Sequence, residues 1–160
     1  ATLTTSDKEL GKELAAAGIG EAYHQKIRPG AAEVVRARAA AGALPVYITA
    51  RPDRVSPQTR AWLLSEDLPS GPLRLQSSVA AALSRSETRK YKERVVRDIL
   101  DRGLQVIAAY GNAVTDIDAY LAAGVAAGRI FIVGPHRGER GTTPVTDYRE
   151  HLEDLAPGAH

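Results

Sequence analysis

Apolar and polar positions alternate in two patterns along the chain. Short apolar runs, bounded by glycine, proline or charged residues, alternate with longer stretches in which small or apolar residues recur at helical spacing. This alternation is typical of a parallel β-sheet covered by helices. Strands are predicted at residues 44–49, 72–75, 104–109 and 129–133.

Helices are predicted between these strands. Pro29 and Gly30 open the first helix, and Gly103 and Gly124 occupy positions typical of C-terminal caps. A last amphipathic segment at residues 145–155 is expected to close the fold, followed by a disordered tail at 156–160. The predicted helices span residues 31–41, 57–64, 87–102 and 114–123.

Length and composition indicate one globular domain. The chain has 160 residues, of which 44% are hydrophobic and 25% charged, and no apolar run reaches the length of a bilayer span. The net charge of +2 favours anionic partners without choosing among them. The absence of cysteine excludes disulfides and a thiolate nucleophile. A cytoplasmic or membrane-peripheral location is favoured, although the composition does not exclude secretion.

The first candidate site lies at the end of the predicted strand 44–49. Thr49 and Arg51 follow an apolar run, and ligands of parallel α/β sheets bind beyond the carboxyl ends of the strands. A hydroxyl and a guanidinium at a strand end can hold a phosphoryl group by hydrogen bonds. The alternative interpretation is that Thr49 caps a turn and Arg51 is a surface charge.

The second candidate site follows the predicted strand 104–109. Gly111 and Asn112 end this apolar run, and Asp116 and Asp118 follow near the start of the next helix. Carboxylate and amide oxygens suit Mg²⁺, so Asn112 and Asp116 are the predicted ligands. An Asx turn and acidic residues near the positive end of a helix dipole also explain the pattern, but not why Gly-Asn ends an apolar strand.

The third candidate is a basic stretch that leads into the helix 87–102. A lysine in this stretch that points toward the strand ends would neutralise a phosphoryl group. Most of these charges are expected on the solvated face of the helix, so only one or two lysines are candidates for the site. The stretch contains Arg85, Arg89, Lys90, Lys92, Arg94 and Arg97.

The order of these candidates resembles motifs two, three and four of the haloacid dehalogenase (HAD) superfamily. The closer resemblance, over roughly residues 1–135, is to the lipin and Nir-type domain, through the blocks Tyr-Ile-Thr-Ala-Arg, Gly-Pro-Leu-Arg-Leu, Lys-Tyr-Lys, Ala-Ala-Tyr-Gly-Asn and Arg-Ile-Phe-Ile-Val-Gly-Pro. The resemblance implies that Thr49 binds phosphate and that Lys92 is the motif-three lysine, with Lys90 as the competing choice. It also implies that Asn112 and Asp116 are the motif-four magnesium positions.

The resemblance departs from the family pattern at the start of the chain. The segment Ala-Thr-Leu-Thr-Thr-Ser-Asp looks like the tail of the Asp-x-Asp-Gly-Thr motif, with Ala1 at the glycine and Thr2 among the expected substrate-binding residues together with Arg51. Both catalytic aspartates would then lie upstream of Ala1. Their strand is expected between the strands 44–49 and 104–109.

The expected fold is therefore a three-layer, Rossmann-like α/β sandwich of HAD type, with a mostly parallel sheet and no large cap domain. The resemblance implies Mg²⁺-dependent hydrolysis of a phosphomonoester through an aspartyl-phosphate, most directly on phosphatidic acid. Two alternatives stay open: a non-catalytic module that binds phosphatidic acid, and a HAD phosphatase for a soluble ester. A lipid phosphate and peripheral membrane contact are expected, and nucleic acid is not.

Overall fold

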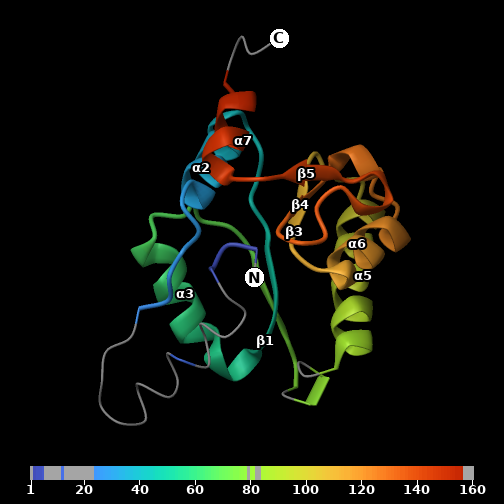
Figure 1. Cartoon of the computed structure of the whole chain (residues 1–160). Coiled ribbons are helices and arrows are strands. Elements are labelled where there is room, and N and C mark those ends of the chain that lie inside the picture. Colours follow the sequence, from blue (N-terminus) through green and yellow to red (C-terminus); the bar gives the residue numbers. More distant parts are fainter. Residues whose placement is uncertain (1, 6–11, 13–23, 79, 82–83, 157–160) are drawn as a thin grey trace.

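A computed structural model describes residues 2–5, 12, 24–78, 80–81 and 84–156. Helices and short parallel strands alternate in it, which confirms the predicted α/β class and is consistent with a Rossmann-like sandwich (Figure 1). In chain order the elements are α2 (Ala31–Ala40), β1 (Tyr47–Pro52), η1 (Asp53–Val55), α3 (Ser56–Ser65), β2 (Leu73–Gln76), α5 (Arg85–Asp101), β3 (Ala109–Gly111), α6 (Val114–Ala123), η2 (Ala127–Arg129), β4 (Ile130–Val133), η3 (Glu139–Gly141), β5 (Thr143–Val145) and α7 (Tyr148–Asp154).

The strands form two separate parallel sheets. One contains β1 and β2, and the other has the order β3-β4-β5. No strand within the described part of the chain joins β1 to β3. Near the start of the chain, Thr4 forms an antiparallel bridge with Ile27. The strand expected between β1 and β3 stays a prediction.

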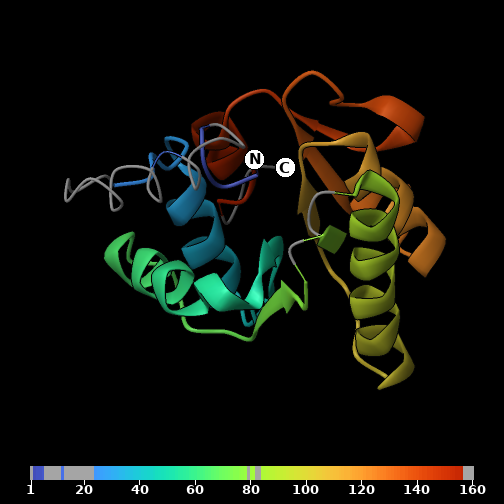
Figure 2. The same cartoon turned by 90° about the horizontal axis from the view of Figure 1, so that it is seen from below.

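Apolar side chains cover both faces of the second sheet. On one face, Ile117 of α6 packs with Ile130 and Ile132 of β4 in a cluster that includes residues of α5, and all three isoleucines are completely buried. On the other face, α2 and α7 pack against β4 and β5 through a cluster that contains Val34 and Tyr148. Figure 2 shows these two pairs of helices on opposite sides of the sheet. The site at the strand ends is therefore attached to a packed core.

Helices agree with the sequence predictions better than strands do. The bounds of α6 match the prediction, and Gly124 ends this helix at a φ of 100°, as expected of a C-terminal cap. The predicted strand 104–109 is wrong except for its last residue, because residues 104–108 pair with no described strand. The predicted strand 44–49 begins three residues too early and ends three too early, since β1 covers Tyr47–Pro52. The short strand β5 was missed; it overlaps the predicted last amphipathic segment at Val145, and α7 begins at Tyr148.

Candidate functional site

Asp116 is the most completely enclosed charged side chain of the candidate site. It lies in the first turn of α6 and is 0% exposed. Its Oδ2 accepts hydrogen bonds from the backbone N–H groups of Asn112 at 2.9 Å and Ala113 at 3.1 Å. Its Oδ1 accepts a hydrogen bond from the Lys92 ammonium. Both carboxylate oxygens are thus bonded within the protein.

Gly111 makes the position of Asp116 possible. A Cβ atom added at Gly111 would lie 2.6 Å from the Asp116 Cβ and 3.0 Å from its Oδ2, well inside van der Waals contact. The carboxylate therefore packs directly on the backbone at the end of β3. This close approach gives a physical reason for a glycine at the end of an apolar strand.

The two candidate lysines of α5 point in different directions. The Lys92 side chain is 14% exposed and reaches Asp116 in α6. The Lys90 side chain is 59% exposed and pairs with Glu87 on its own helix at 3.1 Å. Side chains two residues apart on a helix differ by about 200° in direction, so Lys90 and Lys92 cannot both face the same site. The structure thus brings Lys92, and not Lys90, to the end of β3.

The start of the chain reaches the same place. The Thr2 hydroxyl donates a hydrogen bond to the Asn112 Oδ1 at 3.2 Å. The Thr2 carbonyl accepts a hydrogen bond from the hydroxyl of Tyr148, the first residue of α7, at 3.1 Å. Thr2, Lys92, Asn112 and Asp116 therefore form one connected cluster of predicted site residues.

Thr49 and Arg51 form a second group on β1. They lie where the register between β1 and β2 is irregular, between the pairs Ile48–Arg74 and Pro52–Gln76. The Thr49 hydroxyl accepts a hydrogen bond from the Arg51 backbone N–H at 3.2 Å, and the Arg51 guanidinium donates to the Gln25 Oε1. Irregular pairing of this kind redirects side chains near functional sites. Thr49 lies within the strand and not at its end, which corrects the predicted boundary.

Gln25 contacts a predicted site residue but was not predicted from the sequence. Its side chain is completely buried, it binds Arg51, and its carbonyl accepts a hydrogen bond from the Trp62 indole at 2.9 Å. It therefore connects Arg51 to α3. No motif marks Gln25, because its partners lie far away in the sequence.

The Asp116 carboxylate influences the buried tyrosines around it. Burial raises the pKa of Tyr120 well above its ordinary value, and the charge of the nearby Asp116 carboxylate raises it further. Burial likewise raises the pKa of Tyr148. Both phenols are therefore neutral at physiological pH. They act as hydrogen-bond donors, Tyr120 to the Tyr110 carbonyl at 3.0 Å and Tyr148 to Thr2.

The predicted magnesium ligands lie together at the end of β3, and the magnesium site stays a prediction. Mg²⁺ is bound in proteins through one or two carboxylates and other oxygens. Both oxygens of Asp116 are bonded to N–H groups, and the Asn112 Oδ1 accepts the Thr2 hydrogen bond. In the parts of the chain that the structure describes, no three acidic or histidine side chains gather as a metal site.

Comparisons with known proteins place the chain in a family. Residues 4–134 match the model of the LNS2 domain of PITM 1-3. The chain is 32% identical over 134 residues to human membrane-associated phosphatidylinositol transfer protein 3, covering 83% of this chain and 12% of that protein. It is 32% identical over 134 residues to the Drosophila melanogaster protein retinal degeneration B, covering 81% of this chain and 10% of that protein.

A third relative, rat membrane-associated phosphatidylinositol transfer protein 1, is 30% identical over 138 residues, which are 84% of this chain and 11% of that protein. The chain thus spans about a tenth of the length of these relatives. Two of the three are named membrane-associated, and no helix in the described residues is long and apolar enough to cross a membrane. The chain belongs to the LNS2 domain family of PITM 1-3, a HAD-like domain related to phosphatases.

Proposed function

We propose that this domain is a non-catalytic module that binds phosphatidic acid, or a similar lipid phosphate, at the carboxyl edge of its strands. The observation that carries the proposal is the bonding of Asp116, whose two oxygens are occupied by Lys92 and two backbone amides. This carboxylate orients a lysine at the strand ends. The names of the relatives and the resemblance to lipin and Nir-type domains support a lipid phosphate as the ligand.

The chemistry of the site suits a phosphate group. An ammonium group has three N–H donors. Lys92 donates one of them to Asp116, so the remaining N–H groups are available for phosphate oxygens. Thr49 and Arg51 add a hydroxyl and a guanidinium from the neighbouring sheet. The fixed position of Lys92 lowers the entropy that binding would otherwise cost.

Vesicle binding tests the proposal. Wild-type protein is expected to bind phosphatidylcholine vesicles that contain phosphatidic acid more tightly than vesicles with the same charge of phosphatidylserine, in the presence of EDTA. Lys92→Met should weaken binding to phosphatidic acid by roughly tenfold or more, since it removes a charge-assisted hydrogen bond. Lys90→Met, on the exposed face of the same helix, should bind like wild type.

A further variant guards against a folding artefact. Lys92→Arg keeps the positive charge beside Asp116 and should recover part of the binding that Lys92→Met loses. Circular dichroism then shows whether each variant is folded. Equal affinity for the two anionic lipids, or wild-type affinity in a folded Lys92→Met protein, would contradict the proposal.

Mg²⁺-dependent phosphate hydrolysis is the second candidate function. The observation that favours it is the contact between Lys92 and Asp116, which joins the residues at motif positions three and four. It requires the aspartate nucleophile predicted upstream of Ala1. Phosphate release from phosphatidic acid in the presence of Mg²⁺, measured beside a soluble phosphate ester, distinguishes this enzyme from the binding module and from a phosphatase for soluble substrates.

A further inference from the structure

Three exposed arginines follow the carboxyl ends of three different strands. Arg54 lies in η1 directly after β1, Arg85 is the first residue of α5 after β2, and Arg137 lies in the turn after β4. Among described residues, the side chains of Arg54 and Arg85 make no hydrogen bond or ion pair. Arg137 donates only to the Gly134 carbonyl of its own turn, at 3.2 Å. We name these three residues the basic rim.

Contacts between elements place the basic rim around the candidate site. Lys92 in the second turn of α5 reaches Asp116 in the first turn of α6, so the two helices begin at the same edge. Arg140, in the segment after β4, pairs with Asp118 of α6 and brings that segment to this edge. Helix α5 also packs against β1. The rim residues therefore lie on segments that follow strands of both sheets, at the edge where the site lies.

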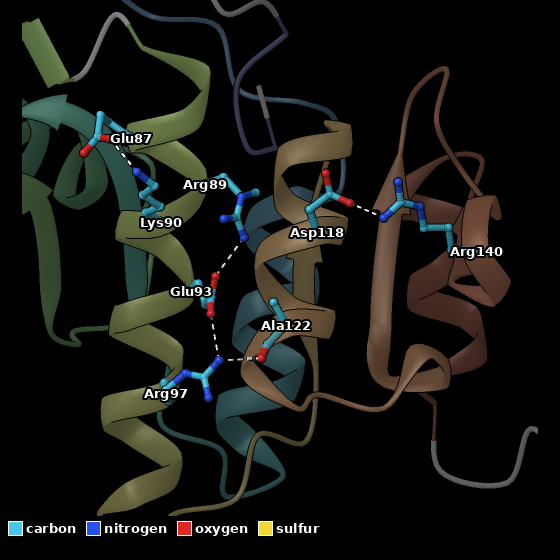
Figure 3. Close-up of polar contacts among 8 residues, drawn as sticks. All are labelled: Glu87, Arg89, Lys90, Glu93, Arg97, Asp118, Ala122 and Arg140. Carbon is cyan, nitrogen blue, oxygen red and sulfur yellow. Dashed lines mark hydrogen bonds and ion pairs between the residues drawn. The ribbon is translucent and has the colours of Figure 1, made fainter.

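Most other cations near this edge are neutralised by carboxylates. Figure 3 shows Arg89 and Arg97 sharing Glu93, with Arg97 also donating to the Ala122 carbonyl at 2.7 Å. The same view shows the Lys90–Glu87 and Arg140–Asp118 pairs, and Lys92 is paired with Asp116. Among the described residues near this edge, the rim residues thus carry positive charge without a carboxylate partner, and so does Arg94 farther along α5.

We propose that the basic rim docks the domain onto an anionic bilayer surface, with the carboxyl edge of the strands facing the lipid headgroups. This inference rests on the proposed binding of a lipid phosphate at that edge. Anionic lipids attract exposed cations within about a Debye length, and each arginine near the surface strengthens binding several-fold. A ligand held by Lys92 can then stay in the membrane while its phosphate is bound.

Matched triple variants test the docking surface. Arg54→Gln/Arg85→Gln/Arg137→Gln removes the rim, whereas Arg94→Gln/Arg102→Gln/Arg129→Gln removes the same charge from exposed arginines that lie farther along α5 or just before β4. Arg102, the cap residue of α5, lies roughly 25 Å along the helix from Arg85 at 1.5 Å per residue. Binding is measured to phosphatidylcholine vesicles with and without about a fifth of phosphatidylserine, at low and at physiological salt.

The rim triple should lose roughly a hundredfold in affinity for the anionic vesicles at low salt, from three charges near the surface. The control triple should lose little. Equal binding by the two triples would overturn the inference.

Binding of soluble dihexanoyl phosphatidic acid distinguishes the role of the rim from that of the ligand site. The rim triple should bind this ligand like wild type, because the ligand needs the site and no membrane. If the rim triple loses dihexanoyl phosphatidic acid as well, the arginines belong to the ligand site and the docking inference is wrong. If wild type fails to bind dihexanoyl phosphatidic acid while the rim triple alone loses anionic vesicles, the proposed ligand fails and the docking surface stands.

Discussion

At the scale of single residues, the absence of a side chain at Gly111 is as important as the charge of Asp116. We expect Gly111→Ala to lower the free energy of unfolding by about 1–3 kcal/mol, because the new methyl group would overlap the Asp116 side chain. Gly128→Ala is the matched control, since nothing lies within 4 Å of its added Cβ, and its effect should stay within about 0.5 kcal/mol. Urea denaturation measures both. Equal effects would show that Asp116 moves aside freely.

His151 should make stability depend on pH. Its ring is buried, and its Nε2 hydrogen-bonds the Tyr110 hydroxyl at 2.9 Å. Burial and the nearby Arg38 guanidinium hold the pKa of His151 below its ordinary value of 6.5. The folded state therefore resists a proton that the unfolded state accepts, so the stability contributed by His151 is complete above about pH 6.5 and is lost as pH falls toward the folded pKa.

The variant His151→Gln isolates this effect. Between about pH 7.5 and 5.5 the unfolding free energy of wild type should fall more steeply than that of His151→Gln, even if the variant is less stable at every pH. Tyr110→Phe, which keeps the histidine, should retain a pH dependence. Parallel curves for wild type and His151→Gln would contradict the assigned direction of the pKa shift.

At the scale of elements, helix α5 positions Lys92 and begins with a side-chain cap. The Ser84 hydroxyl accepts a hydrogen bond from the Glu87 backbone N–H at 3.3 Å. We expect Ser84→Ala to cost about 1 kcal/mol of unfolding free energy, as for other lost N-caps. Ser86→Ala, an exposed position inside the helix, should change stability by a few tenths of a kcal/mol in the favourable direction. Thermal denaturation of the two variants checks the difference, and similar losses would argue against the cap.

Helices could be predicted from the sequence because their signals are local. The apolar spacing and Gly124 gave the bounds of α6, and the resemblance selected Lys92, which the structure places against Asp116. Strands depend on partners far away in the sequence, so the apolar run 104–109 was predicted as a strand although only its last residue pairs with a described strand. The contact between Arg51 and Gln25 depends on tertiary packing alone, and no local pattern reveals it.

At the scale of the whole molecule, apolar residues just before β1 and just before β3 are exposed. Leu44, just before β1, is 68% exposed, and Leu104 and Ile107, just before β3, are 57% and 48% exposed. The backbone of residues 104–108 belongs to no strand. A parallel strand pairs on both sides in the middle of a sheet and buries such residues. A single sheet with the strand order β2-β1-new strand-β3-β4-β5 would pair residues 104–108 in this way.

A strand supplied directly before Ala1 is therefore expected to join the two sheets. In a chain extended by a short apolar segment that ends in Asp-x-Asp, the amides of residues 104–108 should exchange with deuterium at least roughly tenfold more slowly than in the 160-residue chain, because they gain strand partners. Burial of Leu44, Leu104 and Ile107 should add about 1 kcal/mol of stability for each side chain. The same extension with prolines at alternate positions cannot donate ladder hydrogen bonds and is the control. Unchanged exchange in residues 104–108 of the extended chain would show that the strand pairs elsewhere, and the predicted position of the aspartate nucleophile would then be wrong.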